Sequence, residues 1–315
     1  MNKPNQDVFS EMLLALARDD PDILVVTSDS RGSGKLAPFG RELPGQLIEM
    51  GIAEQNLVGV AAGLAAAGKT VFAVSPACFL TARALEQIKN DVAYSDHPVR
   101  LVGISAGVSY GPLGSTHHSL HDFAALTAIH NLTLLAPADN VETAAAVRAA
   151  LVWQGPLYLR FGKKAMPDLS PARAPFAIGQ ARLLSEGRDV TFIATGEMVV
   201  EADRASELLR AEGVSCGVIS MHTVKPLDHD AVLQAAARST AIITVEEHSI
   251  HGGLGSQCAA LLMQQGSRAR FRIVGIPDEH IVTGSQGEIF GHYGMDGPGL
   301  AIVARRLLGM EGSAA

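Results

Sequence analysis

The stretch "MGIAEQNLVGVAAGLAAAGKTVFAVSPACFL", Met50 to Leu80, contains the pattern of a helix, a strand and the start of a second helix. Its first part consists almost entirely of Ala, Gly, Val and Leu, which predicts a buried helix. The following "TVFAVSP" is a short apolar run, as in strands that are buried on both faces of a parallel sheet. The stretch therefore predicts one unit of an α/β fold.

The same alternation continues in both directions along the chain. We expect further strands at residues 22–30, 99–107, 132–139 and 156–162, and helices at 8–20, 84–96 and 141–154. After the proline-rich residues 163–175, strands are expected at 189–196, 214–221, 241–248 and 271–278, with helices at 199–212, 228–238 and 254–266. This pattern predicts two α/β domains, each with a mostly parallel sheet flanked by helices. The expected boundaries are 1–165 for the first domain, 166–186 for a linker and 187–315 for the second domain.

Composition excludes several classes of protein. The net charge is −7 and no long basic run occurs, so nucleic-acid binding is not expected. The N-terminus lacks a signal peptide and no segment is apolar enough to span a membrane, which predicts a cytoplasmic location. Three widely spaced cysteines fit free thiols. Hydrophobic residues make up 47% of the chain and charged residues 18%, so we expect another subunit to cover part of the apolar surface.

Glu54 is the only carboxylate of the apolar helix. In one interpretation it is a first-turn glutamate favoured by the helix dipole. In the other it is a buried acid that shares a proton with a bound base, since a buried carboxyl must be paired, protonated or in use. Gly59 and Gly63 lie four residues apart and leave one face of the helix without side chains, which favours a site where a ligand approaches closely.

A second candidate site is the loop "YGPLGSTHHSLHD", Tyr110 to Asp122. His117, His118 and His121 lie in it, either as solvated loop residues or as groups for substrate contacts and proton transfer. A zinc site is not supported, because no matching acid or cysteine cluster accompanies the histidines.

Three further segments follow predicted strands and have both a structural and a functional interpretation. Phe79 is either a core residue or an aromatic plate for a flat heterocycle, and Arg83 follows four residues later. The loop "TSDSRGSGK" is either a turn or an anion site that includes Ser33. Arg160 ends a strand, where its guanidinium is available to a phosphate.

In sequence order these segments resemble the C-terminal half of the transketolase family, in particular the C-terminal subunit of split, two-subunit members. The resemblance covers nearly the whole chain. In the first domain it rests on "MGIAEQNLVGVAAGLAAAGK", "FLTARALEQIKND", "STHHSLHDFAAL", "LLAPADNVET" and "GPLYLRFGK"; in the second domain, on "MHTVKPLD", "VEEHSIHGGLGS" and "YGMDGPG". The ordered series is specific, whereas no single segment is.

The resemblance implies thiamine diphosphate as cofactor and ketol transfer as reaction. Glu54 matches the family's catalytic glutamate, whose hydrogen bond to the aminopyrimidine ring promotes the imino tautomer of the cofactor. Phe79 matches the aromatic residue that stacks on that ring. The remaining matches are Asp29, Ser30 and Arg83 for the cofactor, His117 for catalysis and donor binding, and Ser33, His118 and Arg160 for substrate binding.

The resemblance also implies a partner. The family holds the diphosphate and Mg²⁺ with a G-D-G…N motif, and no GDG occurs in these 315 residues. A separate N-terminal subunit that carries this motif is therefore expected, with two copies of each subunit in a heterotetramer. The chain alone should be inactive.

Four positions depart from the family pattern. Leu113 stands in place of an aspartate, Ser105 in place of a histidine, His118 in place of a glutamine and Leu85 in place of a tyrosine. These changes predict a sugar phosphate, or an acid-bearing sugar, other than the ordinary pentose phosphates. The alternatives are a deoxyxylulose-phosphate synthase-like enzyme, the beta subunit of a 2-oxo-acid dehydrogenase, and a non-catalytic regulatory subunit.

Overall fold

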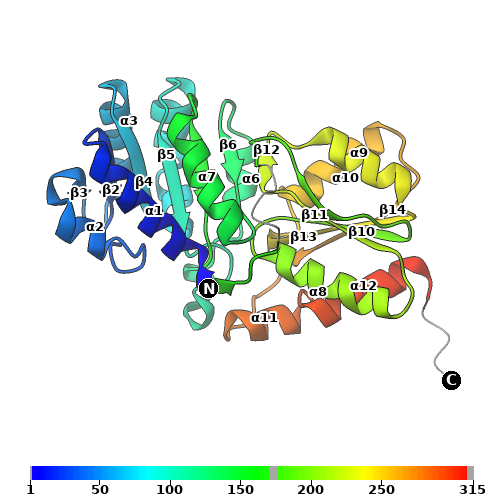
Figure 1. Ribbon diagram of the computed structural model, residues 1–315. Helices are drawn as coiled ribbons and strands as arrows, with labels where there is room; N and C mark the ends of the chain where they lie inside the picture. Colours follow the sequence, from blue (N-terminus) through cyan, green and yellow to red (C-terminus); the bar gives the residue numbers. More distant parts are fainter. Residues whose placement is uncertain (1, 170–175, 311–315) are drawn as a thin grey trace.

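The computed structural model describes residues 2–169 and 176–310, which form two α/β units side by side, each a sheet covered by helices (Figure 1). The first contains a seven-stranded sheet in the order β12-β6-β7-β5-β4-β2-β3, and the second a five-stranded sheet in the order β14-β13-β10-β11-β9. All strands of the first sheet are parallel except β12, and all of the second are parallel except β9. The predicted fold class is confirmed.

The bounds of the elements in the first half agree closely with the expected ranges. The strands are β1 (Lys3–Pro4), β2 (Ile23–Thr27), β3 (Leu47–Glu49), β4 (Thr70–Pro76), β5 (Arg100–Ile104), β6 (Thr133–Leu135), β7 (Leu157–Arg160) and β8 (Ala165–Met166). The helices are α1 (Asn5–Asp19), α2 (Ala37–Glu42), α3 (Glu54–Ala66), α4 (Ala77–Arg83), α5 (Leu85–Gln87), α6 (Asp122–Thr127) and α7 (Asn140–Val152). The helix expected at 84–96 is instead the short α5 followed by a π-helix, Ile88–Tyr94.

Helices cover both faces of the first sheet because each contributes an apolar stripe. Phe9 and Leu13 of α1 and Val147 of α7 pack on one face of the sheet. On the other face, Leu57 of α3 and Phe123 of α6 belong to a second apolar cluster. The carboxyl ends of the parallel strands and the starts of the following helices thus meet at one edge, where ligands of such sheets bind.

The second half has the same architecture. Its strands are β9 (Arg182–Ser185), β10 (Val190–Ala194), β11 (Cys216–Ser220), β12 (Thr223–Lys225), β13 (Ala241–Ser249) and β14 (Arg270–Ile276). Its helices are α8 (Met198–Ala211), α9 (His229–Arg238), α10 (Leu254–Gln264), α11 (Gln286–His292) and α12 (Gly297–Leu308). In Figure 1, α9 and α10 lie on one side of this sheet, and α8, α11 and α12 on the other.

Two strands differ from the expected division of the chain. The range 166–186, expected to be a linker, contains β9, which pairs with β11, so the second sheet begins before residue 187. Residues 170–175 of that range lie outside the described part of the chain. Within the range 187–315, β12 leaves the second sheet and pairs with β6 of the first. Because β12 belongs to one half by sequence and to the other by hydrogen bonding, it fastens the two halves together.

Candidate active site

Glu54 begins α3 and its side chain is only 3% exposed. Nη1 of Arg83 donates to Oε2 of Glu54 at 2.9 Å, and no other described residue makes a hydrogen bond to this carboxylate. Ile52, Asn56 and Arg83 are among the residues that line a surface depression above it. The predicted burial of Glu54 is confirmed, and one of its oxygens remains available to a ligand.

Phe79 and His117 come from different elements and meet beside this depression. The guanidinium carbon of Arg83 lies 4.3 Å from the centroid of the Phe79 ring. The ring of His117 lies edge-on, with 5.3 Å between its centroid and that of Phe79. On its other side His117 contacts Tyr110 at 5.4 Å. The structure thus brings Glu54, Arg83, Phe79 and His117 into one continuous series of contacts.

The second domain supports the loop that carries His117. Gly111 and Gly114 have positive φ angles of 52° and 71°, which allow the chain to turn tightly. A Cβ atom at Gly111 would lie 2.8 Å from the carbonyl oxygen of Gly284, and one at Gly114 would lie 3.2 Å from Thr283. The absence of these two side chains lets the loop pack directly on the segment before α11.

The loop after β2 holds the three other predicted residues of this edge. Asp29 is exposed, has a positive φ of 50°, and donates its backbone N–H to Glu49 at 2.7 Å. Ser30 is buried, with its hydroxyl 2.9 Å from that of Thr27. Ser33 is half-buried. No contact joins these residues to the series from Glu54 to His117 among the described residues, so their expected roles stay predictions.

His118 lies under the loop rather than at its surface. Its side chain is buried and Nε2 lies 3.0 Å from the carbonyl oxygen of Gly111. Burial lowers the pKa of His118, which favours the neutral ring. A direct contact with substrate, as expected from the sequence, would need the loop to open.

Arg160 is enclosed between the two domains. Its Nε donates to Oδ2 of Asp122 at 2.7 Å, and its Nη2 donates to the carbonyl oxygen of Glu247 at 2.7 Å. The hydroxyl of Tyr158 donates to the same oxygen of Asp122 at 2.9 Å. Although burial alone would lower the pKa of Arg160, the charge of Asp122 raises it. The structure therefore gives the guanidinium internal partners instead of the phosphate expected from the sequence, because its strand ends under the second domain.

A group of buried acids from the second domain was not singled out by sequence. Glu246 accepts hydrogen bonds from the backbone N–H groups of Leu254 and Gly255 at the start of α10, and burial raises its pKa to about 7. Glu197 and Glu247 both accept from Nε2 of Gln286, at 3.5 and 2.8 Å. Burial and then the charge of Glu247 raise the pKa of Glu197 to about 8.

These acids lie where the first domain has glycine. A Cβ atom at Gly162 would collide with the carboxylate of Glu197, and one at Gly107 with that of Glu247. The "VEEH" pattern at the end of β13 could have indicated the cluster, since consecutive acids on a buried strand must find partners.

Comparisons with known proteins agree with this geometry. Residues 3–168 match the family described as "Transketolase, pyrimidine binding domain", and residues 179–300 match "Transketolase, C-terminal domain". One of the two subunits of an apulose-4-phosphate transketolase from Phocaeicola vulgatus is 46% identical, over 94% of this chain and 95% of its own length. A 1-deoxy-D-xylulose-5-phosphate synthase of Heliobacterium modesticaldum is 37% identical over 98% of this chain but only 48% of its own length.

Among solved structures, one described as "Split gene transketolase, inactive beta4 tetramer" superposes with a TM-score of 0.86. It is 31% identical, and the match covers 99% of this chain and 100% of the other.

The fold and the matched domains define a protein of the class that is built from a pyrimidine-binding domain and a transketolase C-terminal domain. The chain belongs to the transketolase family, and it corresponds in length to the separate C-terminal subunit of split members.

Proposed function

We propose that this chain is the pyrimidine-binding subunit of a split transketolase. Together with an N-terminal subunit it transfers a two-carbon ketol unit from a ketose phosphate to an aldose phosphate. The proposal is carried by the series of contacts from Glu54 through Arg83 and Phe79 to His117, which places an acid, an aromatic plate and an imidazole along one surface.

The residues present fit thiamine diphosphate. Glu54 holds one oxygen on Arg83 and keeps the other for a ring nitrogen, while Phe79 is only half-buried and offers its ring to a flat heterocycle. When bound, the cofactor supplies a nucleophilic carbon and then stabilises the negative charge that C–C cleavage leaves. The carboxyl of Glu54 shares a proton with the bound ring, and Arg83 fixes the direction of that carboxyl.

His117 acts on the substrate side of the same surface. Its ring is half-buried between Phe79 and Tyr110, and Nδ1 lies 2.9 Å from the hydroxyl of Thr116. If Thr116 fixes Nδ1, Nε2 is the nitrogen left for substrate. We assign to His117 the transfer of a proton to or from the reacting oxygen of the sugar.

A partner subunit completes the site. Ile52 is 73% exposed at the mouth of the depression above Glu54, and Gly59 and Gly63 of α3 have open space above them. The partner would cover this apolar face and hold the diphosphate and Mg²⁺ with the G-D-G…N motif that this chain lacks. The solved split-gene relative is described as an inactive tetramer of one kind of subunit, which supports inactivity without the partner and a heterotetramer with it.

The proposed location is the cytoplasm, where such sugar phosphates occur. Within the described residues no helix is long and apolar enough to cross a membrane.

For the donor we propose apulose 4-phosphate or a closely similar ketose phosphate. This proposal rests on the 46% identical relative that is named for that substrate and on the four departures from the family pattern. Among these, Ser105 is fully buried, so it cannot contact a sugar as an exposed histidine would.

The test is reconstitution. The chain is co-purified with the N-terminal subunit encoded beside it, and ketol transfer from apulose 4-phosphate to an aldose phosphate is followed with thiamine diphosphate and Mg²⁺. Transfer by the pair and none by either chain alone is expected. A pair that assembles and binds the cofactor but transfers no ketol unit from any ketose phosphate would contradict the proposal.

A second candidate is a deoxyxylulose-phosphate synthase-like reaction. It is favoured by a relative that is 37% identical, of which this chain spans about half the length. The same reconstituted pair separates the two, since that reaction releases carbon dioxide from pyruvate whereas ketol transfer does not.

A further inference from the structure

Lys163 is the cation beside the candidate catalytic histidine. Its Nζ lies 4.4 Å from the centroid of the Tyr110 ring, whose other contact is the ring of His117. Among the described residues no carboxylate pairs with Lys163, and its one close contact there is with Tyr110. An ammonium group therefore extends the series of contacts from Glu54 to His117 by one further step.

The neighbours of Lys163 in the chain explain why it faces this way. The second domain holds each of them: Arg160 donates to the backbone of Glu247, Gly162 fits under Glu197, and Nζ of Lys164 lies 3.2 Å from Glu201. With its flanks fixed on the second domain, the segment leaves Lys163 on the side of Tyr110.

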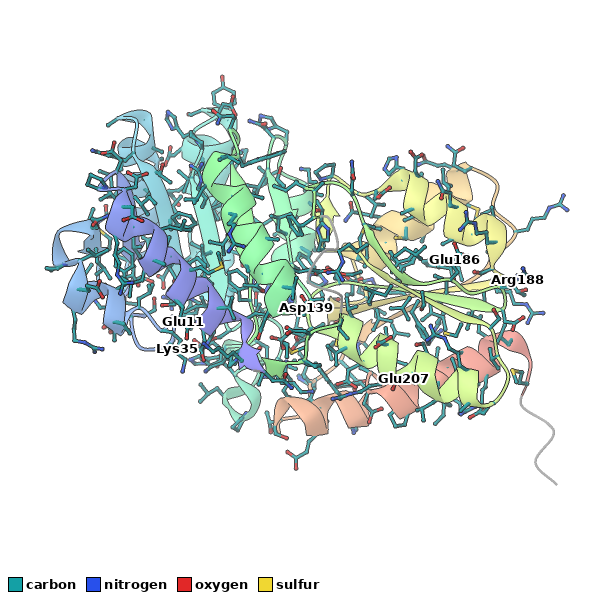
Figure 2. All side chains as sticks on the ribbon, viewed as in Figure 1. Glu11, Lys35, Asp139, Glu186, Arg188 and Glu207 are labelled. Carbon is teal, nitrogen blue, oxygen red and sulfur yellow. The ribbon has the colours of Figure 1, made fainter. Side chains whose placement is uncertain are left out.

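The surroundings of Lys163 favour an anion. Burial and then the charge of Lys35 lower the pKa of Lys163, because both disfavour the ammonium form. Lys35, labelled in Figure 2, has only a long ion pair with Asp7 at 3.8 Å. A bound oxyanion would relieve the repulsion between the two lysines and restore the solvation that Lys163 has lost.

We propose that Lys163 binds the terminal phosphate of the sugar substrate and so determines specificity for phosphorylated sugars. This inference rests on the proposed function, and it assigns the anion to a residue that sequence analysis placed in a proline-rich connecting segment. Arg160 is excluded from this role by its internal partners Asp122 and Glu247.

The test compares Lys163→Met and Lys163→Arg in the complex with the N-terminal subunit. Inorganic phosphate is titrated into the complex by calorimetry, and KM is measured for apulose 4-phosphate and for apulose itself. We expect Lys163→Met to weaken phosphate binding and raise KM for the phosphorylated sugar by roughly tenfold, as for loss of a charged hydrogen bond. KM for apulose should not change, and Lys163→Arg should stay within about threefold of the wild type because it keeps the charge.

Arg188→Met is the matched control, since it removes one positive charge from an exposed position at the remote end of the second sheet (Figure 2). Unchanged phosphate binding and KM in Lys163→Met would overturn the assignment even if ketol transfer is normal. Phosphate binding that depends on Lys163 in a complex that transfers no ketol unit would instead support the anion site and contradict the proposed function. Thermal unfolding of each variant verifies that it is folded.

Discussion

Arg83 donates to the carboxylate of Glu54 at 2.9 Å while its guanidinium carbon lies 4.3 Å from the centre of the Phe79 ring. One side chain thus fixes both the acid and the aromatic plate. Because Arg83 itself is 47% exposed, this arrangement lies at the surface and faces whatever covers the depression above Glu54.

The first prediction concerns the acid. Glu54→Gln should lower turnover of the reconstituted complex by about a thousandfold or more, because an amide cannot share a proton with the cofactor ring, and proton transfer by a positioned group contributes about 10²–10⁴-fold. Assembly with the partner should be unaffected, since Gln still accepts from Arg83. Steady-state kinetics and size-exclusion chromatography measure the two properties.

Its control is Glu207→Gln, at an exposed position of α8 that is labelled in Figure 2. This change should leave both properties as they are in the wild type. Near-normal turnover in Glu54→Gln would remove Glu54 from the mechanism.

The second prediction concerns the residue that orients the acid. Arg83→Met should lower kcat by about ten- to a hundredfold, since it removes a charged hydrogen bond worth about 1.5–3 kcal/mol from a buried carboxylate. Arg83→Lys should recover part of that loss because it keeps a cation near Glu54 and Phe79. If Lys and Met variants are equally active, the charge of Arg83 has no role.

The third prediction concerns the division of the cofactor site. The purified chain should bind thiamine diphosphate at least about a hundredfold more weakly than the complex, because loss of several charge-assisted contacts to the diphosphate costs more than about 3 kcal/mol. Calorimetry with and without the N-terminal subunit gives both affinities. Equally tight binding to the isolated chain would refute a shared site.

The fourth prediction follows from the buried acid at the domain boundary. Burial and then the charge of Glu247 raise the pKa of Glu197 from 4.5 to about 8. The folded protein thus binds this proton more tightly than the unfolded chain, so its stability falls as pH rises from about 4.5 to about 8.

Glu197→Gln has no proton to lose and can still meet Gln286. Relative to the wild type it should gain about 2 kcal/mol in free energy of unfolding between pH 5 and pH 8, less than the full linkage value. Urea denaturation at both pH values measures this difference. An equal effect at both pH values would show that Glu197 does not titrate in this range.

The sequence was sufficient to predict the parallel α/β architecture, because buried strands and apolar helices alternate with little ambiguity. It also predicted the burial of Glu54, since a single carboxylate in an apolar helix has few alternatives. The approach of Phe79 to His117 was expected only through the resemblance, because nothing local relates two residues 38 positions apart in the chain.

The contacts between the domains could not be predicted in this way. Arg160 and His118 follow a strand and a glycine-rich turn, and whether such side chains face solvent depends on what packs above them. Here the second domain covers Arg160, and the loop's own backbone binds His118. The pairing of β12 with the first sheet has the same origin, since a three-residue strand carries no sign of its partner. Lys163 was missed because prolines nearby indicated a linker.

The last prediction concerns the choice of sugar. Leu113 stands where the family resemblance implies an aspartate that contacts substrate hydroxyls, and it is 54% exposed on the loop that carries His117. The wild-type complex should therefore use xylulose 5-phosphate and ribose 5-phosphate poorly. Leu113→Asp should raise kcat/KM for this pair by about tenfold, the value of one charged hydrogen bond to a hydroxyl, at little cost in stability because the side chain is not in the core.

The control is Leu113→Asn, which has nearly the same shape but no charge and should gain less. Coupled assays of both variants with the pentose phosphates, and with apulose 4-phosphate for comparison, give the specificity ratio. Efficient use of the pentose phosphates by the wild type would show that Leu113 does not restrict the substrate. A gain in Leu113→Asp confined to the pentose phosphates would place the hydroxyls of the sugar at this loop, between His117 and the exposed edge of the site.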